Sequence, residues 1–72
     1  MITLFFNNKL SQKIILQCSS NDSIITIKKL ISLKIGVCYK HIQIYKNSVM
    51  LRDSITLKDY EIHDGASLEI IF

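Results

Sequence analysis

The sequence predicts a small α+β domain in which a mixed β-sheet wraps around one helix. Apolar runs with the spacing of strands lie on both sides of one segment with helical spacing, in the order β-β-α-β-β-β. The size agrees, because 72 residues with 49% hydrophobic content and no proline suit one core but no second domain. We therefore expect a single domain over residues 1–72.

The first two strands are expected to form a β-hairpin. Residues 2–6 (ITLFF) are apolar, with the β-branched and aromatic side chains that favour strands. The next residues, NNKLS at 7–11, have the asparagine-rich composition of a tight turn, and residues 12–18 (QKIILQC) resume the extended pattern.

The helix is predicted over residues 23–35. Ser23 suits the N-cap, and Asp22, expected to be exposed, places a negative charge at the positive end of the helix dipole. Gly36 stands where a left-handed C-cap is needed. The helix is supported by apolar side chains that recur at three- and four-residue intervals: Ile24, Ile27, Leu30, Ile31, Leu33 and Ile35.

The second half of the chain is predicted to hold three strands. A connection at 53–65 is expected to contain a single helical turn near residues 56–60. The other segments are a strand at 41–46 (HIQIYK), a turn at 46–49 (KNSV), a short edge strand at 49–51 (VML) and a last strand at 67–72.

Charge and composition argue against several kinds of partner. The net charge of +3 comes from nine Lys plus Arg against six Asp plus Glu, and only Arg52 is an arginine. Surfaces that read nucleic acid usually cluster arginine with aromatic residues, whereas these lysines are scattered, so we expect no direct nucleic-acid binding. The sequence has neither a signal peptide nor an apolar run of membrane length, so we expect no membrane association. Cys18 and Cys38 lie outside any CxxC motif and are expected to be the reduced thiols of an intracellular protein.

Candidate catalytic and metal-binding groups are few. Cys38 and His41 are close enough in sequence for an activated thiol, although a cysteine near a histidine often arises by chance. Glu61, His63 and Asp64 have the side chains of metal ligands but lack a fourth partner, and Asp64 also suits a turn with the glycine after it. There is no glycine-rich phosphate loop and no catalytic pair of carboxylates. We expect no cofactor and no enzyme, with a thiol enzyme at Cys38 as the competing hypothesis.

Lys28 is a charged residue among the apolar positions of the predicted helix. If its side chain turns toward the sheet, it needs a carboxylate partner, and Asp53 after the short edge strand is the candidate. The alternative is a lysine whose long stem carries the ammonium group to water.

The chain resembles ubiquitin over essentially its whole length. The resemblance lies in the β-β-α-β-β-β order, in the helix opened by NDSI and in the ending LKDYEIHDGASLEIIF, where TLKDYEI at 56–62 is similar to a TLSDYNI stretch of ubiquitin-like proteins. It implies the β-grasp fold and an ion pair matching Lys28 and Asp53. The match is closer to the Hub-type ubiquitin-like proteins, the small splicing-associated relatives of ubiquitin, through DYEIHDG at 59–65, the Asn-Asp step before the helix and KKLI within it. The chain departs from that family at Tyr39, where a Trp is common, and in ending with Ile-Ile-Phe rather than a tyrosine pair and one more residue.

The resemblance also implies a mode of binding. Ubiquitin-type modifiers are conjugated through a flexible tail ending in Gly-Gly, whereas the last predicted strand here runs to Phe72, so noncovalent binding is expected. Lys9, Tyr45 and Ile71 match the three aliphatic residues of the apolar patch of ubiquitin, and a charge and a phenol there disfavour ubiquitin receptors.

Hub-type proteins resemble one another at an acidic residue before the helix, which forms a salt bridge with an arginine of a short helical motif in spliceosomal partners. Asp22 is the matching position, and Ile25 and Lys29 lie beside it on the helix. The residues alone favour a plain helix-terminus charge for Asp22; the resemblance makes partner binding an equal alternative, and one carboxylate can serve both roles.

The function implied is a noncovalent binding module that modulates pre-mRNA splicing by docking on a helical motif of a tri-snRNP protein. We expect it to act as a monomer in the nucleus and cytoplasm. The alternative is a ubiquitin-like modifier or adaptor in protein turnover or the stress response.

Overall fold

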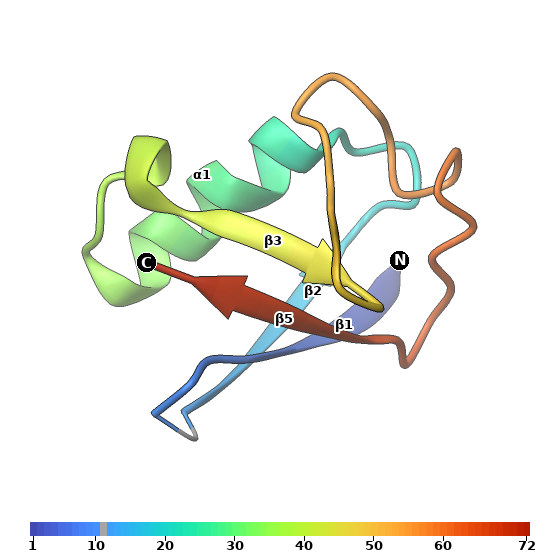
Figure 1. Cartoon of the computed structure of the whole chain (residues 1–72). Coiled ribbons are helices and arrows are strands. Elements are labelled where there is room, and N and C mark those ends of the chain that lie inside the picture. The colour runs from blue at the N-terminus through green and yellow to red at the C-terminus, as the bar shows by residue number, and fades with distance from the viewer. Residues whose placement is uncertain (11) are drawn as a thin grey trace.

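The computed structural model describes residues 1–10 and 12–72 as one curved sheet with a helix against one face (Figure 1). The predicted element order and α+β β-grasp architecture are confirmed, with one 3₁₀ turn added between the helix and the third strand. The elements are β1 (Ile2–Asn7), β2 (Lys13–Cys18), α1 (Ile24–Ile35), η1 (Tyr39–His41), β3 (Gln43–Lys46), β4 (Val49–Met50) and β5 (Ser67–Ile71).

The sheet is mixed, as predicted. Its strand order is β2-β1-β5-β3-β4, so the first and last strands of the chain lie side by side at its centre (Figure 1). These two strands are parallel, with Phe6 opposite Leu68, whereas the β1–β2, β3–β5 and β3–β4 pairs are antiparallel. A parallel pair cannot be joined by a tight turn, and here the chain between β1 and β5 supplies the rest of the fold.

Strand alternation places the core between the sheet and α1. Leu4 and Phe6 of β1 are fully buried, as are Ile24, Ile27 and Ile31 of the helix. Burying one such side chain stabilises the fold by about 1.5–3 kcal/mol, so this layer holds the helix on the sheet. Further buried apolar residues are Leu16, Cys18, Ile42, Ile44, Leu51, Leu57, Ile62, Leu68 and Ile70.

α1 begins at the predicted N-cap, but a distant loop satisfies its first amides. Ser23 has the extended backbone of an N-cap, and its side chain makes no capping hydrogen bond. Instead, the N–H of Ile24 donates to the carbonyl of Ile55 (3.0 Å), and the N–H of Ile25 donates to that of Asp53 (3.1 Å). These orphan donors of a helix start are therefore bound by main-chain carbonyls from the segment after β4.

The helix ends where predicted. Gly36 has the left-handed φ of 74°, which favours glycine, and its N–H donates to the carbonyl of Ser32 (2.9 Å). The chain then forms η1, because the N–H of His41 donates to the carbonyl of Cys38 (2.9 Å). The strand predicted to begin at residue 41 therefore begins at Gln43.

The β1–β2 turn is organised by one asparagine. Asn8 Oδ1 accepts hydrogen bonds from the N–H groups of Leu10 and Gln12, both at 3.0 Å. Such a side-chain acceptor is the usual reason for asparagine in tight turns. Ser11, in the predicted turn, lies outside the described residues.

The remaining turns agree with the prediction in place and differ in detail. Asn47 and Ser48 both have positive φ, 52° and 67°, as a two-residue hairpin turn between β3 and β4 requires. The expected helical turn near 56–60 is a hydrogen-bonded turn in which the N–H of Tyr60 donates to the carbonyl of Thr56 (3.3 Å). The strands β4 and β5 are each one residue shorter than predicted.

Candidate partner-binding site

Asp22 is held in a fixed position in the loop before α1. Its Oδ2 accepts a hydrogen bond from the N–H of Ser19 (3.0 Å), and its own N–H donates to the carbonyl of Ser19 (3.0 Å). Its carbonyl accepts from the N–H of Leu57 (3.0 Å). Among the residues that the structure describes, no hydrogen bond to the other carboxylate oxygen, Oδ1, is found.

The carboxylate is less exposed than the sequence suggested. Asp22 is half-buried, because the bond to Ser19 draws it against the loop. The expectation of an exposed side chain is therefore wrong. A charged acceptor that is fixed and partly shielded from water binds a cation more strongly than a mobile surface carboxylate does.

Ile25 and Lys29 follow Asp22 along the helix. Ile25 is half-buried and Lys29 is exposed, one helical turn apart. The Lys29 ammonium group lies 5.3 Å from the centroid of the Tyr39 ring, in a cation–π arrangement between α1 and η1. The structure thus gives the Lys29 ammonium an aromatic partner on η1, which orients the side chain and leaves its charge in place.

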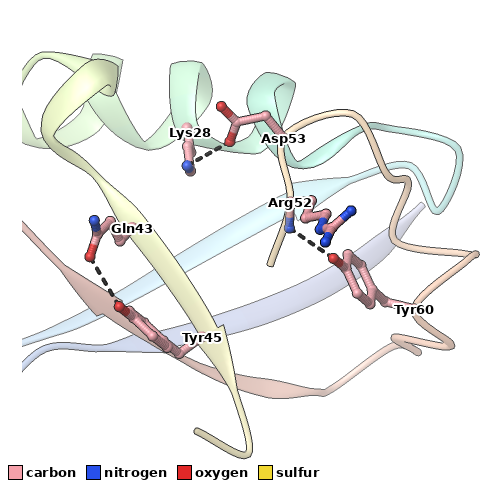
Figure 2. A network of polar contacts seen from close by, with 6 residues as sticks. All are labelled: Lys28, Gln43, Tyr45, Arg52, Asp53 and Tyr60. Atoms are coloured by element: carbon pink, nitrogen blue, oxygen red, sulfur yellow. Dashed lines mark hydrogen bonds and ion pairs between the residues drawn. The ribbon is translucent and has the colours of Figure 1, made fainter. Parts of the chain in front are cut away.

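The structure brings Lys28 and Asp53 together (Figure 2). Lys28 Nζ lies 2.6 Å from Asp53 Oδ1, with the side chains 11% and 53% exposed. The main-chain carbonyl of Asp53 also accepts the N–H of Ile25. Asp53 thus ties the segment after β4 to the helix through both its side chain and its backbone.

Tyr60 is a structural residue that the sequence analysis did not single out. Its hydroxyl accepts the N–H of Arg52 (2.8 Å), and its carbonyl accepts Lys46 Nζ (3.4 Å). Figure 2 shows the hydrogen bond between Arg52 and Tyr60 beside the Lys28–Asp53 pair. The TLKDYEI motif that contains Tyr60 was the available signal, and its role is to hold in place the segment that carries Asp53.

The candidate catalytic and metal-binding groups are not assembled into a site. Cys18 and Cys38 are free thiols. The bond between Cys38 and His41 is a main-chain bond of η1 rather than a thiol–imidazole contact. Over the described chain, no three His, Cys, Asp or Glu side chains are placed to hold a metal ion. Asp64 Oδ1 instead accepts the N–H of Thr3 (2.7 Å) and anchors β1.

The Cys18 thiol is buried, and its surroundings change its pKa. The pKa of the Cys18 thiol is raised above its ordinary value, first by burial and then by the Asp22 carboxylate.

In residues 1–10 and 12–72, no helix is both long enough and apolar enough to span a bilayer.

The outward face of the sheet is polar where ubiquitin has its apolar patch. Tyr45 pairs across the strands with Glu69, which puts a carboxylate at the centre of this face. The Tyr45 hydroxyl donates to Gln43 Oε1 (3.1 Å), and Lys9 is exposed at the nearby hairpin. Exposed apolar surface remains at Ile71, which is 36% exposed, and at Met50, which pairs with Tyr45 and is 53% exposed.

Comparison with known proteins agrees with this geometry. Residues 4–72 match the ubiquitin family model. The chain is 40% identical to "Ubiquitin-like modifier HUB1" of Debaryomyces hansenii and 38% identical to the protein of that name from Saccharomyces cerevisiae. It is also 38% identical to "Ubiquitin-like protein 5" of Drosophila melanogaster. Each match covers 100% of this chain and 99% of the relative. The chain therefore belongs to the ubiquitin family, as a Hub-type ubiquitin-like protein.

Proposed function

We propose that this chain is a noncovalent protein-binding module that modulates pre-mRNA splicing by docking on a helical motif of a tri-snRNP protein. In this proposal it acts as a monomer in the nucleus and cytoplasm and performs no catalysis of its own. The observation that carries the proposal is the Asp22 carboxylate, in which Oδ2 accepts the N–H of Ser19 and Oδ1 accepts no hydrogen bond from the described residues.

The geometry suits an arginine on a partner helix. Because a main-chain N–H already orients the Asp22 carboxylate, little side-chain entropy is lost when a guanidinium group binds it. An N–H is a dipole and does not neutralise the charge, so Asp22 still attracts a cation. Ile25 provides a half-buried apolar contact next to it, as an amphipathic helix requires.

The test compares Asp22→Asn with Asp59→Asn. Asn keeps a side-chain oxygen for the Ser19 N–H, so it removes the charge and leaves the loop intact. Asp59 is exposed on the turn at 57–61, and its variant makes the same change in net charge. The probe is an amphipathic helical peptide of a splicing protein with one arginine, titrated by calorimetry at moderate salt.

Asp22→Asn is expected to weaken binding by about 2–5 kcal/mol, because an arginine at a packed interface loses its charged acceptor. Asp59→Asn is expected to change it by less than about 0.5 kcal/mol. Replacing the arginine of the peptide by glutamine should remove the difference between the parent chain and Asp22→Asn. Equal binding by the parent and Asp22→Asn would refute the proposal.

A second candidate function is a covalent modifier or an adaptor in protein turnover or the stress response. It is favoured by the word "modifier" in the names of the yeast relatives. Intact-mass analysis of cell extracts distinguishes the two. Adducts of this chain that survive boiling and reductant would support the modifier function, and their absence alongside noncovalent complexes that contain tri-snRNP proteins would support the splicing module.

A further inference from the structure

A shallow hollow with a positive rim lies beside the Lys28–Asp53 ion pair. It is bounded by α1, by η1 and by the segment after β4, which contribute Lys28, Lys40 and Arg52 respectively. Asp53 lies in the same wall, and Figure 2 shows it between Lys28 and Arg52. Three cations and one carboxylate leave the hollow with a net charge of +2.

This charge is not compensated within the described part of the chain. Asp53 is already bound to Lys28 at 2.6 Å, which is the ion pair found at the hollow. In residues 1–10 and 12–72, no carboxylate lies within ion-pair distance of Lys40 or Arg52. Arg52 is anchored through its main chain, since its N–H donates to the Tyr60 hydroxyl. The hollow thus presents two exposed cations from a fixed backbone.

The floor of the hollow is apolar. Ile42 and Leu51 are 1% and 3% exposed, and Met50 at the rim is 53% exposed. Among the described residues that line the hollow, none is aromatic, so stacking of nucleic-acid bases has no platform here. A peptide side chain, in contrast, would find apolar contact on Met50.

The edge of the sheet lies next to this floor. Strand β4 is at one end of the strand order and pairs only with β3 among the described strands. An edge strand leaves main-chain donors and acceptors on its outer side, which an extended peptide can use.

We propose that this hollow binds an acidic peptide segment in an extended conformation. Its carboxylates contact Lys40 and Arg52, and an apolar side chain between them packs on Met50. The Lys28–Asp53 pair forms the rear wall of the hollow. Because its two charges neutralise each other, it does not bind the carboxylates of the peptide. This surface goes beyond the proposed function, which uses the negative Asp22 and a cationic partner.

The test uses a capped, fluorescein-labelled peptide of alternating glutamate and leucine, with binding followed by fluorescence anisotropy. The double variant Lys40→Gln, Arg52→Gln removes the two exposed cations without touching the ion pair. The matched control is Lys9→Gln, Lys58→Gln, which removes the same charge from exposed positions elsewhere. Circular dichroism confirms that both variants fold.

The expected result is a rise in Kd of at least about tenfold for the Lys40, Arg52 variant and of less than about twofold for the control. Binding should weaken as salt is raised, and a peptide of alternating glutamine and leucine should not bind. Asp22→Asn should leave the Kd unchanged, so failure of this proposal and failure of the splicing proposal are distinguishable.

Three outcomes would overturn the inference. Equal losses in the two double variants would show attraction to net charge alone. If the acidic peptide does not bind at all, the hollow is not a peptide-binding site. Tighter binding of a single-stranded uridine oligonucleotide than of the peptide, lost with the same two cations, would assign the hollow to nucleic acid instead.

Discussion

Asp22 and Asp53 both lie beside the first turn of α1, yet their carboxylates meet different partners. Asp53 is bound by the ammonium group of Lys28 at 2.6 Å, whereas Asp22 is bound by the main-chain N–H of Ser19 at 3.0 Å. An ammonium group neutralises the charge of a carboxylate, and an amide dipole only orients it. The difference shows that an ordered or partly buried carboxylate does not always serve the fold alone. When its partner is a dipole, its negative charge can still attract a cation from a binding partner.

The largest expected effect in the fold tests the Asp53 side of this comparison. Asp53→Asn leaves Lys28 unpaired with a side chain that is only 11% exposed, so the free energy of unfolding should fall by about 2 kcal/mol. The loss is below the range for fully buried pairs because the Asp53 carboxylate is itself half-exposed. Urea denaturation followed by circular dichroism measures it.

Lys28→Met is the matching control for Asp53→Asn. It removes the charge but keeps an apolar stem of similar length, so it should cost less than about 1 kcal/mol. The double variant should be no less stable than Asp53→Asn alone. Unchanged denaturation midpoints in both single variants would mean that the pair is an ordinary surface contact.

The second prediction tests whether the Asp22 side chain also stabilises the fold. Asp22→Ala removes the acceptor of the Ser19 N–H, so it should lower the free energy of unfolding by about 1 kcal/mol. Asp22→Asn keeps an oxygen at that position and should cost less than about 0.5 kcal/mol. Both values come from urea denaturation, and equal losses in the two variants would assign the effect to charge rather than to the hydrogen bond.

Much of the fold could be predicted because its signals are local. The helix bounds follow from Ser23, from Gly36 and from the apolar spacing between them, and the structure places the caps at those residues. The capping of the helix amides by the carbonyls of Asp53 and Ile55 was not predictable, because it depends on contacts across about thirty residues of chain.

For the candidate site, the role of Asp22 in binding stays a prediction, and the sequence did not predict its environment. Asp22 was singled out, yet its bond to Ser19 was missed although the Ser-Ser-Asn-Asp segment has the composition of a turn closed by a side-chain oxygen. Lys29 was grouped with Asp22 by helical spacing. Its contact with Tyr39 depends on how η1 folds back on α1, which spacing within the helix does not reveal.

The smallest expected effect is the electrostatic influence of Asp22 on Cys18. The pKa of the Cys18 thiol is raised above its ordinary value of 9.0 by burial and, secondly, by the Asp22 carboxylate. Asp53 is not among the causes of this shift. A pH titration of the Cys18 ¹³Cβ resonance in a Cys38→Ser background should therefore show a lower pKa in Asp22→Asn and an unchanged one in Asp53→Asn.

The same shift fixes the sign of the pH dependence of stability. Because the folded state holds the Cys18 proton more tightly than the unfolded state, this contribution to stability is complete below pH 9.0 and is lost as the pH rises through the raised pKa. Cys18→Ala should flatten the alkaline decline, measured as the urea midpoint against pH with Cys38 already replaced by serine. Asp22→Asn should flatten it slightly, since burial, the larger cause, remains. The contradicting outcome is an alkaline decline in stability that is identical in the parent and Asp22→Asn, together with an unchanged pKa of the Cys18 thiol. It would show that solvent screens the Asp22 charge even at this half-buried position. The contrast with Asp53 would then be one of geometry alone.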